Sequence, residues 1–157
     1  MKKCLQGQIY RSTENDCQGT GTSDDNFGAL TLQYCASDDD SCKDTSGTNG
    51  IASTELSPAS ASCASDTTDG KSWILPIVVP EPYPPNPNPP ISREILIYMP
   101  ELPRGETDYF WSALNSYWSD KEATVFSFQS DLSVASDFKP KSSTQFVLCV
   151  TEKVQTE

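Results

Sequence analysis

The chain has 157 residues, 36% of them hydrophobic, and a formal net charge of −11. This length suits one domain with a core of its own, or two very small domains. The acidic charge argues against nucleic acids, anionic membranes and sulfated polysaccharides as direct partners, because these bind cationic surfaces. The sequence predicts no transmembrane helix, since no stretch approaches the roughly 18 consecutive apolar residues that one needs.

The N-terminal half is poor in apolar residues and rich in turn-forming ones. Residues 4–11 predict a short strand, residues 12–28 predict turns, and residues 29–35 alternate in the way typical of a second strand. Ser57 suits an N-cap and Pro58 the first helical position, so a short helix is expected after them. Because so few apolar residues are available, this half must be held by something other than apolar burial.

The C-terminal half supplies most of the core. Alternation in its last apolar segment places Phe146, Leu148 and Val150 on one face of a strand and Cys149 on the other. The expected picture is mostly β, with one or two short helices and long loops. The segments that predict strands here are 95–99, 109–113, 123–128 and 144–151.

Six cysteines, widely spaced and without a CxxC pair, indicate three disulfides in an oxidising compartment. We therefore expect a secreted, periplasmic or cell-surface protein. Met1-Lys2-Lys3 resembles the start of a secretory signal without its hydrophobic region, so we infer that a signal peptide was removed. A zinc site is not expected, because the chain has no histidine and the one short cysteine pair has the wrong spacing. The six are Cys4, Cys17, Cys35, Cys42, Cys63 and Cys149.

Several motifs follow one another along the chain in an order that is informative as a set. They are CLQGQIY (4–10), NDCQGTG (15–21), QYC (33–35), CA (63–64), DGKSWILP (69–76), YFWS (109–112), ATVFSF (123–128) and FVLCV (146–150). The series resembles the Lcl C-terminal family of secreted bacterial proteins, formerly a domain of unknown function. The match covers residues 60–151. The chain departs from the family at Ile74, where the family has arginine, and after Pro76, where prolines replace an expected helix.

The resemblance implies an α+β, mostly β, C-type-lectin-like fold that is loop-rich and stabilised by disulfides. It also implies a Cys63–Cys149 bridge between the first long helix and the last strand. Such a bridge closes a loop of about 90 residues, for which the chain-entropy model gives a stabilisation on the order of 4 kcal/mol. By proximity the remaining pairs would be Cys4–Cys17 and Cys35–Cys42, although four cysteines allow three pairings.

The same resemblance favours a single domain over residues 1–157. Residues 4–50 form a cysteine-bearing N-terminal extension and residues 51–151 a lectin-like core. The run PEPYPPNPNPP at 80–90 is then a stiff polyproline insertion within one domain rather than a linker between two. Residues 152–157 are expected to be a frayed tail.

The chemistry of the side chains argues against an enzyme. Without histidine the chain lacks serine–histidine and cysteine–histidine catalysis, and no GxSxG, P-loop or dinucleotide motif is present. No cofactor is expected. Calcium is the one alternative, because the acidic loops carry oxygen ligands, but the EF-hand pattern is missing and solvated loop aspartates are the preferred interpretation. The calcium candidates are Asp24, Asp25, Asn26, Asp38, Asp39, Asp40, Asp66 and Asp69.

Aromatic residues are the other candidate site. Trp73 and Trp111 lie in core motifs and are expected to be buried, whereas Tyr83, Tyr117 and Trp118 are the candidates for contact with a partner. We therefore expect a non-catalytic secreted or periplasmic binding module that recognises a protein or a glycan. The alternative is a structural subunit of a bacterial surface or periplasmic filament or sheath. A related enzyme of the formylglycine-generating type would need reactive cysteines or a metal, which the sequence does not indicate.

Overall fold

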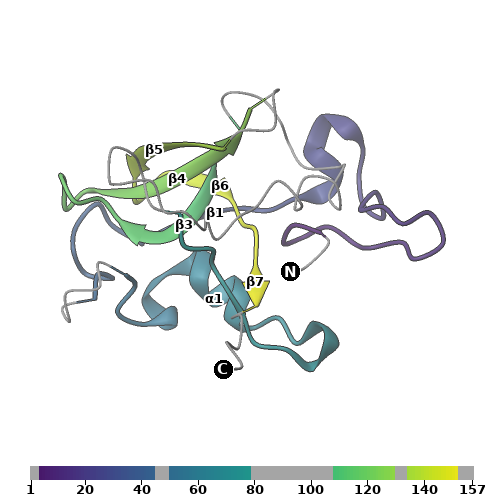
Figure 1. The fold of residues 1–157 in the computed structure, drawn as a ribbon, viewed down its shortest axis with the longest axis horizontal. Helices are drawn as coiled ribbons and strands as arrows, with labels where there is room; N and C mark the ends of the chain where they lie inside the picture. The colour runs from purple at the N-terminus through teal and green to yellow at the C-terminus, as the bar shows by residue number, and fades with distance from the viewer. Residues whose placement is uncertain (1–3, 45–49, 79–107, 130–133, 152–157) are drawn as a thin grey trace.

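The computed structural model describes residues 4–44, 50–78, 108–129 and 134–151. These residues form a mostly β structure with few helices and three disulfides (Figure 1). In chain order the elements are η1 (Ser23–Gly28), β1 (Thr31–Gln33), η2 (Thr54–Leu56), α1 (Pro58–Ala64), η3 (Thr68–Gly70), β2 (Trp73–Ile74), β3 (Phe110–Asn115), β4 (Glu122–Phe128), β5 (Val134–Pro140), β6 (Thr144–Phe146) and β7 (Val150–Thr151).

The larger sheet has five strands in the order β1-β6-β3-β4-β5. All of its pairs are antiparallel except β3 with β6, which meet in parallel at Phe110 and Phe146. A register shift between Trp111 and Asn115 interrupts the pairing of β3 with β4. β2 and β7 form a separate antiparallel pair, which lies with α1 below the large sheet in Figure 1.

Neighbouring residues of the central strands belong to two separate clusters of buried side chains. Trp111 joins Tyr34 in the first cluster, with ring centroids 5.3 Å apart, whereas Phe110 stacks on Phe126 in the second at 5.5 Å. Successive residues of a strand point to opposite faces, so β3 serves both clusters. Cys149 belongs to the first cluster, which places the long disulfide inside the core.

Several predicted elements are confirmed. The expected strands at 29–35, 109–113 and 123–128 correspond to β1, β3 and β4, and the expected helix is α1. Ser57 caps this helix by accepting a hydrogen bond from the Ser60 amide at 3.2 Å. The N-terminal residues expected to form an extension also contribute to the large sheet, because β1 pairs with β6.

Two strand predictions need correction. Residues 4–11 form no strand, because Gln8 turns the chain back on Leu5 through hydrogen bonds in both directions and Gly7 has a φ of +87°. Residues 144–151 form two short strands rather than one, with 147–149 between them. The expected alternation holds for Phe146 and Leu148, which pack in one cluster, and for Cys149, which packs in the other, whereas Val150 belongs to neither cluster.

The three disulfides are Cys4–Cys17, Cys35–Cys42 and Cys63–Cys149, which are the expected pairs. All six cysteines are 5% exposed or less. The proline run 80–90 with Tyr83, the expected strand 95–99 and the tail 152–157 lie outside the described residues.

Candidate binding surface

The turn between β3 and β4, residues 116–121, carries two exposed aromatic side chains and is called the aromatic tip below. Trp118 is 80% exposed and Tyr117 49% exposed. Although these side chains are exposed, hydrogen bonds order the backbone of the turn. The Ser116 hydroxyl accepts hydrogen bonds from the amides of Trp118 (3.1 Å) and Ser119 (3.3 Å), and the Ser116 amide donates to the Glu122 carbonyl at 3.0 Å. The exposed indole is therefore carried by a turn whose backbone is hydrogen-bonded.

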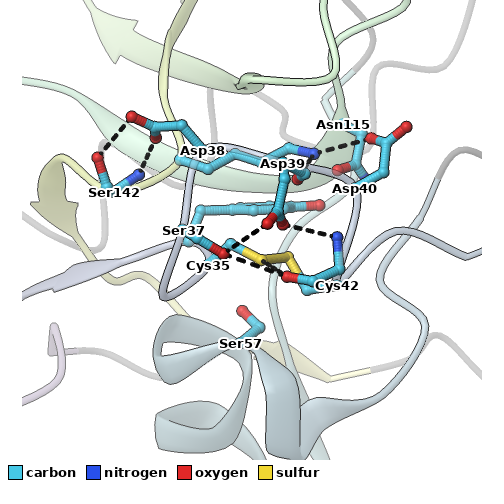
Figure 2. Close-up of a disulfide and its surroundings, with 12 residues drawn as sticks. Cys35, Ser37, Asp38, Asp39, Asp40, Cys42, Ser57, Asn115 and Ser142 are labelled. Carbon is cyan, nitrogen blue, oxygen red and sulfur yellow. Dashed lines mark hydrogen bonds and ion pairs between the residues drawn. A yellow bond between two sulfur atoms is a disulfide. The ribbon is translucent and has the colours of Figure 1, made fainter.

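The second part of the surface is the acidic loop, residues 35–42, which the Cys35–Cys42 disulfide closes. Asp38, Asp39 and Asp40 are all exposed. Figure 2 shows the Asp38 carboxylate directed at Ser142, whose amide and hydroxyl donate to it at 2.6 and 2.8 Å. These bonds fix one end of the loop to the segment between β5 and β6.

Asp39 is held from within the loop itself. Its carboxylate accepts hydrogen bonds from the Ser41 amide (2.8 Å) and the Ser37 hydroxyl (2.9 Å). Hydrogen bonding from Ser41, and then from Ser37, lowers the pKa of Asp39 below its usual value. The carboxylate is thus fixed in place and ionised at neutral pH.

Lys141 joins the acidic loop to the aromatic tip. Its fully buried ammonium group donates to the Asp39 carbonyl at 2.7 Å and to the Asp40 carboxylate at 3.2 Å. Its backbone amide donates to the Lys121 carbonyl of the tip at 3.0 Å, and its carbonyl accepts from the Tyr34 and Cys35 amides. The acidic loop and the aromatic tip are therefore neighbours at one end of the sheet.

An apolar hollow of about 250 Å³ lies beside Ala113 and Leu114 of β3. Residues from β2, β3 and α1 line it, together with the chain at Gly50, whose carbonyl accepts a hydrogen bond from Asn115 at 2.6 Å. Its lining is mainly apolar and offers no set of convergent charged groups. The lining residues are Gly50, Ile51, Ser60, Ile74, Leu75, Ile77, Ala113 and Leu114.

The structure bears out the division of the tryptophans. Trp73 and Trp111 are buried, and their indole N–H groups donate to the carbonyls of Thr68 (3.0 Å) and Leu32 (2.7 Å). Trp118 is the exposed one. Sequence reasoning missed Lys141, because a lysine in a polar segment gives no signal that it will be buried by a loop a hundred residues away.

Two of the remaining calcium candidates, Asp25 and Asp66, accept hydrogen bonds from the backbone of their own loops, and Asp66 also accepts one from the Gln6 side chain at 3.1 Å. Asp25 accepts a hydrogen bond from the Thr22 amide at 2.8 Å in the capping box of η1, and Asp66 accepts one from the Thr68 amide at 2.9 Å. Among the described residues, no three histidine, cysteine or acidic side chains gather where they could hold a metal ion.

Comparison with known proteins adds no relative. No protein-family model matches the chain, no curated protein matches it, and no solved structure matches it. Within the described segments, no helix has both the length and the apolar character needed to cross a membrane.

Proposed function

We propose that the chain is a non-catalytic binding module that recognises a protein or glycan partner through its aromatic tip. The observation that carries this proposal is the 80% exposure of Trp118 on a turn whose backbone is fixed by Ser116. An exposed indole adds little to folding, but it buries a large area when a partner covers it. Since the turn is already ordered, binding loses little conformational entropy.

The resemblance to the Lcl C-terminal family supports the same function. The motifs occur in the family's order, and a disulfide joins α1 to the residue that precedes β7. This bridge is close to the link between the first helix and the last strand that the resemblance implies. The three disulfides favour an oxidising location, which supports a secreted, periplasmic or cell-surface module.

The test compares Trp118→Ala with wild type on a glycan array and in cross-linking to the secreted and envelope proteins of the source organism. Truncation of a tryptophan hot spot costs about 2 kcal/mol or more, so retention by the partner should weaken about 30-fold. The matched control is Tyr10→Ala, which removes an exposed aromatic ring from another loop and should leave retention unchanged. Equal retention of wild type and Trp118→Ala would refute a role for the tip.

The alternative is a structural subunit of a filament or sheath, and β5 is the observation that favours it. This seven-residue strand lies at one edge of the large sheet as described, where a strand of another subunit could pair with it. Lys139 and Pro140 are residue types that discourage such pairing. Light scattering after size exclusion separates the two functions, because an assembly subunit forms ordered oligomers whereas a binding module with no partner stays monomeric.

A further inference from the structure

We propose that the partner is a cationic polypeptide segment that places an arginine or lysine side chain on the Trp118 ring while its other basic groups face the acidic loop. This inference rests on the proposed function and specifies the chemistry of its partner.

The first step is the Trp118 ring itself. Tryptophan has the strongest attraction for cations of the aromatic side chains, because its π-face is electron-rich. The same sheet contains a contact of this kind, in which the Lys139 ammonium lies 4.3 Å from the centre of the Tyr109 ring. With Trp118 80% exposed, its ring is accessible to a guanidinium or ammonium group from another chain.

The second step is the charge around the ring. Asp120 lies in the aromatic tip, and Glu122 directly follows the tip. The acidic loop adds three aspartates, and Lys141 links this loop to the tip through hydrogen bonds to Asp39 and Lys121. These five carboxylates outnumber the three nearby lysines, Lys43, Lys121 and Lys141. Lys141 is buried, and Lys43 lies 3.6 Å from Asp40, so Lys121 is the cation that the tip exposes. The surface is thus net negative and complementary to a basic segment.

The third step is the fixed position of these carboxylates. Ser142 holds Asp38, while Ser37 and Ser41 hold Asp39. Carboxylates that are already oriented need less reorganisation when a cation arrives. Acidic partners are repelled by the net charge of −11, and a second copy of the chain carries the same charge.

The experiment measures fluorescence anisotropy of a labelled decapeptide of alternating arginine and glycine, with a glutamine–glycine decapeptide as the neutral control. The arginine peptide should bind and the glutamine peptide should not. Trp118→Ala should weaken binding by about tenfold or more, and Trp118→Phe by less, since phenylalanine keeps a weaker π-face. Affinity should fall as sodium chloride rises from about 50 to about 500 mM, because salt screens surface charge.

A matched pair of charge variants separates the local surface from the overall charge. Asp120→Asn and Glu14→Gln each remove one exposed carboxylate, but only Asp120 belongs to the tip. Asp120→Asn should weaken peptide binding about two- to threefold, whereas Glu14→Gln should leave it unchanged. Equal effects of the two variants, or undiminished binding to Trp118→Ala, would overturn the inference.

Failure of this inference is distinguishable from failure of the proposed function. If Trp118→Ala loses the natural partner while the arginine peptide never binds, the tip is a binding site but its ligand is not cationic. Retention of a neutral glycan that is insensitive to salt leads to the same conclusion. If Trp118→Ala changes neither measurement, both proposals are wrong.

Discussion

Removal of the disulfides one at a time should destabilise the protein in the order of the loops that they close. Each bridge is removed by changing both of its cysteines to alanine. The three bridges span 86, 13 and 7 residues for Cys63–Cys149, Cys4–Cys17 and Cys35–Cys42. A bridge limits the conformations of the unfolded chain, and this limit grows with the logarithm of the loop length.

The chain-entropy model gives the expected losses. Taking these separations as loop lengths, removal lowers the free energy of unfolding by about 4.6 kcal/mol for the long bridge. The corresponding losses are about 2.9 kcal/mol for Cys4–Cys17 and about 2.4 kcal/mol for Cys35–Cys42. All six cysteines are nearly or fully buried, so the packing lost with the two sulfur atoms should be similar in the three variants. The difference of about 1.7 kcal/mol between the first two variants therefore reports loop length.

The assay is urea-induced unfolding of wild type and the three variants under non-reducing conditions, followed by tryptophan fluorescence and circular dichroism. Peptide mapping confirms that the two remaining bridges of each variant are intact. If loss of Cys4–Cys17 destabilises the protein as much as loss of Cys63–Cys149, loop closure is not the main contribution of the long bridge. A long-bridge variant that does not fold at all would agree with the predicted order.

Three smaller changes test individual contacts. Ser57→Ala removes the cap of α1 and should lower the free energy of unfolding by about 1 kcal/mol, and an unchanged urea midpoint would contradict that role. Asp39 has a lowered pKa, so the stability that it contributes is present at neutral pH and is lost as the pH falls below about 4. Asp39→Asn should therefore reduce the loss of unfolding free energy between pH 6 and pH 2, measured by urea unfolding. A loss equal to that of wild type would refute this. Burial raises the pKa of Tyr34, so stability should fall as the pH rises above about 10. Tyr34→Phe should reduce this fall in alkaline urea melts, and an equally steep fall in the variant would show that other groups cause it.

Local chemistry allowed much of the fold to be predicted from the sequence. Ser57 followed by Pro58 marks a helix start that depends only on neighbouring residues, and α1 begins there. The apolar segment at 123–128 predicts a strand in which Phe126 and Phe128 share one face and Val125 lies on the other. β4 confirms this, because Val125 packs in the first cluster and both phenylalanines pack in the second. The observed disulfide pairs agree with the predicted ones. The resemblance implies Cys63–Cys149, and proximity in the sequence selects the other two pairs from three possible pairings.

The features that were missed depend on contacts between distant segments. β5 (Val134–Pro140) carries charged residues and little alternation, so it becomes a strand because β4 offers it a partner along its full length. Residues 4–11 have strand-like composition, yet Gly7 and Gln8 bend them into a turn. The Gln6 amide of this turn donates a hydrogen bond to the Val147 carbonyl. Tertiary context outweighs local preference in both cases.

Lys141 changes how the acidic loop itself is understood. From the sequence, three successive aspartates suggest either a cation site or a solvated loop. In the structure a lysine ammonium donates to the Asp39 carbonyl at 2.7 Å and to the Asp40 carboxylate at 3.2 Å, so the chain supplies a cation to its own loop. A buried ammonium is stable only with such oxygen partners, and the loop is ordered by providing them. The acidic loop is thus part of the scaffold that positions the aromatic tip, and its outward carboxylates determine the charge that a partner meets.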